Sequence, residues 1–160
     1  LSAAFENSEE KSARKDMSIV SLFGGMALAN AKLGAVHGFA GPIGGMFDAP
    51  HGAVCARLLP FVVETNAKAL QARQPASPIL DRYGELSRLL TGNKNADISA
   101  GISHLVEMGE RFAIPKLSSF GMSREDIESI VGKSQKVSSM KGNPIELTTA
   151  ELHHILKMAL

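Results

Sequence analysis

Two histidines, His37 and His51, stand fourteen positions apart on either side of a glycine-rich segment that ends in Pro50. Neutral imidazole is the commonest metal ligand among side chains. If the glycine-rich segment is a turn between two antiparallel helices, residues at this spacing can meet, and metals in helical bundles are held in this way. The pattern therefore indicates either a shared divalent metal or two histidines packed in a core, and the spacing alone leaves both open.

The remaining candidates for chemistry are weaker. His104 falls on an expected helix, and His153 and His154 are adjacent, so they point to different faces of their helix. We expect all three to be structural or solvated. Cys55, the only cysteine, lies in an apolar run with no established base beside it, which predicts a small buried hydrophobic residue. No residue of the chain is assigned a catalytic role.

Apolar residues recur at three and four positions through most of the chain, which is the helical period. Caps and breaks set the expected boundaries, notably Ser77 as an N-cap and capping-box patterns at 123–126 and 148–151. No sustained strand-type alternation occurs, so the predicted fold is all-α, a multi-helix bundle. The expected helices cover residues 8–30, 33–40, 50–69, 77–91, 97–112, a short one from 123, and 148–160.

Two local features carry structural expectations. Gly24 and Gly25 disfavour a helix, so we expect them, with the neighbouring small alanines, to allow a neighbouring backbone to pack closely there. Gly41-Pro42 is expected to weaken or kink the helix that follows residue 33, and Pro60 to bend the next one.

Length and composition predict one folded domain over residues 1–160. Hydrophobic residues make up 44% and charged residues 21%, and the net charge is +1. So small a charge attracts neither nucleic acid nor anionic lipid, and residues 17–47 are too polar for a membrane span, so we expect neither kind of partner.

A single cysteine excludes an intramolecular disulfide and favours a cytoplasmic protein. The chain opens with Leu1, which hints at a fragment.

The segment GAVHGFAGPIGGMFDAPHG, residues 34–52, followed by RLLP at 57–60, resembles the second signature of the iron-containing (group III) alcohol dehydrogenases. The likeness extends back through ANAKLG at 29–34 and forward to GNP at 142–144 and the closing LTTAEL segment. It covers almost the whole chain. The resemblance implies the helical C-terminal domain of such an enzyme, a dehydroquinate synthase-like bundle, without the N-terminal α/β domain that binds the dinucleotide.

By this resemblance His37 and His51 match two metal-binding histidines of the family. Its other two protein ligands, an aspartate and a histidine, lie upstream of residue 1. The implied activity is NAD- or NADP-linked oxidation of an alcohol, or reduction of an aldehyde or ketone, assisted by Fe²⁺, with Zn²⁺ or another divalent ion as alternatives. The dinucleotide would be bound mainly by the missing domain, so we expect the isolated chain to be inactive. The resemblance also allows a homodimer.

Four further positions match the substrate or nicotinamide cleft of these enzymes: Leu28, Leu33, Gly41 and Ser139. Many family members have a second histidine where this chain has Gly41, so a proton-relay role for that histidine does not carry over, and the pocket beside His37 is wider.

A non-catalytic alternative stays open. The small-residue stretch from Gly24 to Gly34 could dock onto a partner chain, which would make the protein a helical interaction module or a split subunit.

Overall fold

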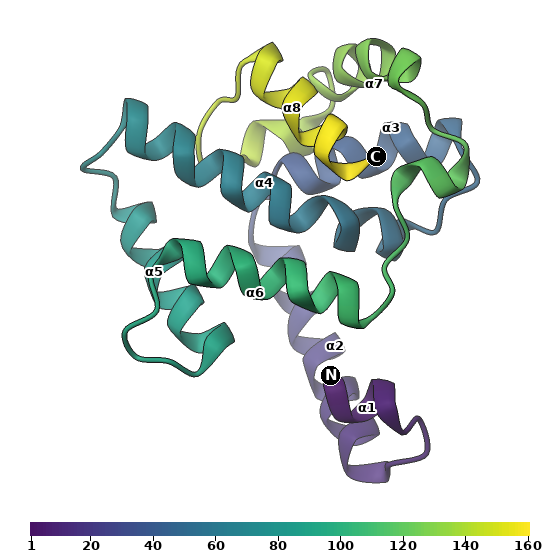
Figure 1. Ribbon diagram of the computed structural model, residues 1–160, viewed down its shortest axis with the longest axis vertical. Helices are drawn as coiled ribbons and strands as arrows, with labels where there is room; N and C mark the ends of the chain where they lie inside the picture. Colours follow the sequence, from purple (N-terminus) through teal and green to yellow (C-terminus); the bar gives the residue numbers. More distant parts are fainter. The chain divides into compact units, whose positions relative to one another are not determined.

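The structure is a computed structural model that describes residues 1–160. It contains eight α-helices, three short 3₁₀ helices and no strand, which confirms the all-α prediction (Figure 1). The α-helices are α1 (Ser2–Glu6), α2 (Lys11–Asn30), α3 (Ala35–Met46), α4 (His51–Arg73), α5 (Pro78–Thr91), α6 (Ile98–Arg111), α7 (Ile127–Ser134) and α8 (Thr149–Ala159). The 3₁₀ helices are η1 (Leu117–Phe120), η2 (Arg124–Asp126) and η3 (Ser138–Gly142).

The chain divides into two compact units, Leu1–Lys32 and Leu33–Leu160. The first holds α1 and α2, and the second holds all the other helices. The expectation of a single domain over residues 1–160 therefore stays a prediction.

In the first unit, α2 exposes most of its large apolar side chains. Its N-cap is Glu10, whose carboxylate accepts from the Ser12 N–H at 3.1 Å. The exposed apolar residues of α2 are Ile19, Val20, Leu22, Phe23, Met26 and Leu28. A Cβ added at Gly24 or Gly25 would meet nothing within 4 Å. The close packing expected on these glycines therefore stays a prediction.

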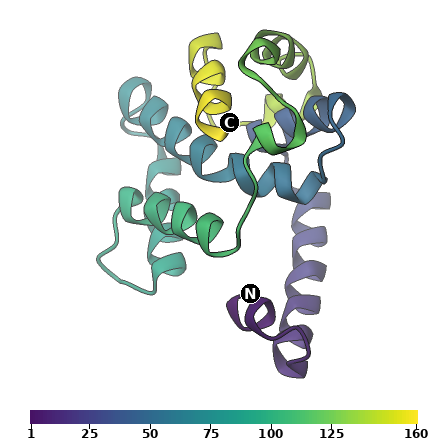
Figure 2. The ribbon, with the colours of Figure 1, turned by 45° about the vertical axis from the view of Figure 1, so that its right-hand side comes forward.

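In the second unit, α4 is the central helix. Helices α3 and α8 pack against it, α7 packs against both of them, and α5 and α6 lie together on the other side of α4 (Figures 1 and 2). This arrangement buries α4 over much of its length, as expected for the central helix of a bundle. The largest fully buried side chains come mainly from α3, α4, α7 and α8, and they are Phe39, Ile43, Leu58, Leu70, Leu117, Ile130, Leu152, Ile155 and Leu156.

The start of α3 is fixed by an asparagine far away in sequence. Residues 31–34 are not helical, so the prediction that helix continues directly from residue 33 is wrong. The Asn143 Oδ1 atom accepts from the Ala35 N–H at 3.1 Å, which satisfies one of the free donors at the helix N-terminus. A Cβ on Gly34 would lie 3.1 Å from the same oxygen, so glycine leaves room for this contact.

The Asn143 side chain also connects α3 to α4. Its Nδ2 donates to Asn66 Oδ1 and to the Ile145 carbonyl, both at 2.7 Å. In return Asn66 Nδ2 donates to Asn143 Oδ1 at 3.2 Å. Because Asn66 is only 3% exposed, water cannot readily replace these bonds. The pair therefore fixes the N-terminus of α3 beside the middle of α4.

Two prolines lie inside helices without ending them. Helix α3 continues past Pro42 to Met46, and α4 continues past Pro60 to Arg73, beyond the expected end near residue 69. A proline inside a helix costs about 3 kcal/mol or more through a lost hydrogen bond and a clash with the preceding turn. Phe39 and Ile43 in α3 are almost fully buried around the first of these sites, and tertiary packing of this kind outweighs the local penalty.

Other helix ends follow the sequence signals. Ser77 caps α5, which ends at Gly92 with φ of +67°, and Asp97 caps α6. Thr148 and Glu151 form the predicted capping box of α8. Burial alone would raise the pKa of Glu151, but the hydrogen bonds from Arg73 and Thr148 outweigh it, so the pKa lies below 4.5.

No single helix is long and apolar enough to cross a membrane. Helices α2 and α3 pass the same test of length and composition only when taken together as a broken pair.

Candidate metal centre

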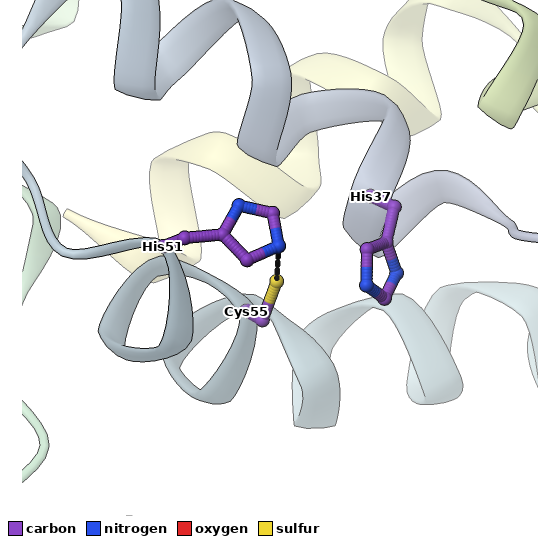
Figure 3. A group of neighbouring side chains, drawn as sticks. All are labelled: His37, His51 and Cys55. Carbon is purple, nitrogen blue, oxygen red and sulfur yellow. Dashed lines mark hydrogen bonds between the residues drawn. The ribbon is translucent and has the colours of Figure 1, made fainter. Parts of the chain in front are cut away.

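The structure brings together the two histidines that the sequence singles out. His37 lies in the first turn of α3, and His51 is the first residue of α4. Their ring centroids are 5.5 Å apart and their planes are inclined by 47° (Figure 3). His37 is half-buried and His51 is exposed. Two imidazoles at this separation and from different helices can bind one ion between them.

Short-range geometry and core packing explain this meeting. Residues 47–50 form the connection between α3 and α4, and Pro50, at the N-cap, has φ of −57° and precedes the helix start as its sequence position predicts. Phe39 and Ile43 of α3 and Val54 of α4 are at most 1% exposed and belong to one core cluster. Because His37 and His51 lie within one turn of these packed residues, both backbones are held firmly.

Cys55 lies with the two histidines, although its apolar neighbours in the sequence predict a core position. Its Sγ lies 3.4 Å from His51 Nε2, and one ligand atom from each of His37, His51 and Cys55 lies within 4.8 Å of the others (Figure 3). The prediction that Cys55 is a buried core residue is wrong in one respect: the residue packs against the core but is only half-buried, and its sulfur faces His51. Burial raises the pKa of its thiol. The signal in the sequence was the four-residue spacing from His51, which puts both side chains on one face of a helix.

Glycines leave space around this cluster. A Cβ on Gly38 would lie 2.8 Å from the Met140 Cε, so Gly38 allows the end of η3 to pack beside the first turn of α3. A Cβ on Gly41, one turn after His37, would meet nothing within 4 Å. The face of α3 beyond His37 is therefore open to a ligand.

The four residues predicted to line a cleft are distributed over both units of the chain. Gly41 is exposed on α3, and Ser139 is half-buried in η3, next to the Met140 that packs on Gly38. Leu33 is half-buried just before α3. Leu28 lies in the other unit, on α2, and is 53% exposed. Their roles in a cleft stay predictions.

The donors of the cluster are two imidazoles and one thiol, and no carboxylate belongs to it. His104, His153 and His154 lie on α6 and α8 and are not part of the group. Imidazole suits Zn²⁺, Fe²⁺ and other transition ions, whereas Mg²⁺ and Ca²⁺ prefer oxygen ligands. The residues present therefore fit a divalent transition metal.

Comparison with known proteins identifies the family of this chain. A family model for the C-terminal part of the iron-containing alcohol dehydrogenase family matches residues 1–160. Alcohol dehydrogenase 4 of Saccharomyces cerevisiae (strain YJM789) is 32% identical over 99% of the chain and 40% of its own length. Lactaldehyde reductase of Escherichia coli (strain K12) is 29% identical over 91% of the chain and 38% of its own length. The solved alcohol dehydrogenase from Oenococcus oeni superposes with a TM-score of 0.86 at 30% identity, covering 99% of this chain and 40% of that one.

The chain thus belongs to the iron-containing alcohol dehydrogenase family and corresponds to its helical C-terminal part. It spans about 40% of the length of the relatives it matches.

Proposed function

We propose that His37 and His51 bind a divalent metal, Fe²⁺ or Zn²⁺, as part of an NAD(P)-linked alcohol dehydrogenase. The observation that carries this proposal is the meeting of the two imidazoles, with ring centroids 5.5 Å apart, at the junction of α3 and α4 in a chain of this family. An ion bound there would polarise the oxygen of an alcohol or a carbonyl group as a Lewis acid. The remaining ligands and the dinucleotide site would come from sequence outside these residues, so the 160 residues alone would not catalyse.

The chain's own residues contribute position and space. The buried Phe39 and Val54 hold the two helices together, so the histidine backbones need little reorganisation when a metal binds. Asn143 holds the N-terminus of α3, two residues before His37. The lack of a side chain at Gly41 leaves room beside His37 for a substrate.

The substrate class we propose is a small alcohol or aldehyde. Relatives at 29–32% identity are named for an alcohol and for lactaldehyde, both small oxygen compounds. Gly41 is open, so the pocket near His37 would accept a bulkier group than one with a side chain at that position. A reducing compartment such as the cytoplasm would keep Cys55 as a free thiol.

A second candidate function rests on α2. Six large apolar side chains of this helix are exposed, and Phe23, at 61%, is one of the most exposed. A surface of this kind marks a contact with another chain or domain. The non-catalytic interaction module therefore remains the alternative. The native reading frame upstream decides between the two, because an Asp-x-x-x-His pair and a glycine-rich α/β segment there would favour the dehydrogenase.

Calorimetric titration of the chain with Zn²⁺ tests the metal site. We expect binding of one ion per chain, weakened strongly by His37→Ala and by His51→Ala, since each removes one ligand. His104→Ala is the matched control, because His104 lies on α6 outside the cluster, and it should bind as the unsubstituted chain does. Binding that both site variants leave unchanged would contradict the proposal.

A further inference from the structure

Cys55 is placed as a ligand would be, one helical turn after His51. Residues four apart on a helix are neighbours on one face, and here the Sγ lies 3.4 Å from His51 Nε2. Cys55 is only half-buried and the neighbouring His51 is exposed, so an ion can approach the pair from solvent. Cys55 is the only cysteine of the chain, so no disulfide within the chain can occupy it.

The distances suit shared coordination. Zn–S bonds of about 2.3 Å and Zn–N bonds of about 2.0–2.1 Å in a tetrahedral site place neighbouring ligand atoms roughly 3.3–3.6 Å apart. The sulfur and the His51 nitrogen are already at 3.4 Å, within that range. The three ligand atoms of the cluster all lie within 4.8 Å of one another, so small side-chain rotations of His37 would complete the geometry.

We propose that the Cys55 thiolate is a third ligand from this chain to the metal held by His37 and His51, and that it favours a borderline-soft ion, Zn²⁺ in preference to Fe²⁺. This inference rests on the proposed function, since it needs the metal to lie between the two histidines. The preference follows because thiolate ligands select soft or borderline ions, and Zn²⁺ also binds more tightly than Fe²⁺ in the general affinity order. On binding, the thiol releases its proton to solvent and a sulfur–metal bond forms, with no change of oxidation state.

The same geometry also fits a plain hydrogen-bonding contact between the Cys55 thiol and the His51 ring, without a metal ion. A thiol can donate weakly to a ring nitrogen at this distance. The two interpretations predict different behaviour of the sulfur when a metal ion binds, because only a thiol that acts as a ligand exchanges its proton for the metal.

Titration of the reduced full chain with Co²⁺ tests the proposal through a readout independent of enzyme activity. A cobalt–thiolate bond produces a charge-transfer absorption in the near ultraviolet, which imidazole ligands do not. We expect this band to saturate at one ion per chain and to be absent in Cys55→Ser. The substitution Cys55→Ser should also weaken Zn²⁺ binding by at least about tenfold, because losing even an outer-shell partner weakens metal affinity about 10- to 100-fold.

Alkylation gives a second, independent measurement. Since the chain has one thiol, the mass gained after treatment with iodoacetamide reports on Cys55 alone. Bound Zn²⁺ should slow this reaction about tenfold or more, since the metal holds the attacking sulfur. In His37→Ala the protection should be lost. Thermal unfolding of Cys55→Ser and Cys55→Ala checks that both variants fold as the unsubstituted chain does.

The outcomes separate this inference from the proposed function. The thiolate ligand would be overturned if the chain showed no charge-transfer band and if Cys55→Ser left the Zn²⁺ affinity unchanged. If His37→Ala and His51→Ala then still abolished Zn²⁺ binding, the histidine site itself would be supported. Zn²⁺ affinity unchanged in all three variants would overturn both.

Discussion

Replacing Asn143 by alanine is the sharpest test of how the fold positions the site. The Asn143 side chain takes part in four hydrogen bonds, with the Ala35 N–H, with the Ile145 carbonyl, and two with Asn66. Alanine removes all four, including both bonds between Asn143 and the buried Asn66 side chain. The structure thus predicts a loss of stability together with a loosening of the first turn of α3, which carries His37.

The magnitude follows from these bonds. Each contributes about 0.5–1.5 kcal/mol net, and because two of the four join the same pair of side chains their contributions are not additive, so we expect a loss of about 3 kcal/mol. For a chain of this size 1 kcal/mol corresponds to about 2–4 °C, so Tm should fall by about 6–12 °C. A double-mutant cycle with Asn66→Ala should show a coupling of about 1–2 kcal/mol, because the two side chains bond directly.

Urea and thermal unfolding measure these changes, with Asn95→Ala as the matched control. Asn95 is exposed in the loop between α5 and α6, so its replacement should change stability by less than about 0.5 kcal/mol. The reasoning is refuted if Asn143→Ala is no more destabilising than Asn95→Ala, or if the coupling with Asn66 is absent.

Three further outcomes can be checked by unfolding experiments. Gly101→Ala should destabilise the chain by about 3 kcal/mol, because the added Cβ would lie 2.7 Å from the Ser87 Cβ. Gly109→Ala, on the same helix, should instead stabilise the chain by about 0.5–1 kcal/mol, because its Cβ would meet nothing within 4 Å. Similar stability changes for the two variants would contradict the packing of α5 on α6. Gly41→His should fold with stability within about 0.5 kcal/mol of the unsubstituted chain, because the site is open, and a larger loss would show that it is not. Glu151→Gln should lower the free energy of unfolding by about 1 kcal/mol near neutral pH. Because the pKa of Glu151 is lowered in the folded chain, this stabilisation is present above pH 4.5 and is lost as the pH falls through the folded-state pKa. A difference in stability between the two chains that persists in acid would contradict this prediction.

Much of the helical architecture could be predicted from local signals. Ser77 before Pro78 and the Thr148–Glu151 capping box lie at the ends that the sequence indicates, because caps act through neighbouring residues. The start of α3 at Ala35, two residues after the expected start, could not be predicted in this way. The Ala35 N–H donates to Asn143, which is 108 positions away and reaches it only in the folded chain.

Only part of the candidate site could be predicted from the sequence. The meeting of His37 and His51 follows from a glycine-rich turn between helices, which the sequence displays directly. The apolar neighbours of Cys55 predict a core position, and the residue does pack against the core, although it is only half-buried. The direction of its sulfur depends on the helix starting at His51, which puts position 55 on the histidine face.

Close packing on α2 stays a prediction. No atom lies within 4 Å of a Cβ added at Gly24 or Gly25, and the large apolar side chains around them are exposed. The composition of α2 predicts a contact surface, but it does not say whether the partner of that surface belongs to the same chain.

The most direct test of the central claim is a crystal of this chain soaked in Zn²⁺, with anomalous diffraction recorded at the zinc edge. The proposed site predicts one anomalous peak between α3 and α4, about 2.0–2.1 Å from a ring nitrogen of His37 and of His51. A zinc peak only elsewhere on the chain, or none at the two histidines at a concentration that saturates binding in solution, would contradict the metal site.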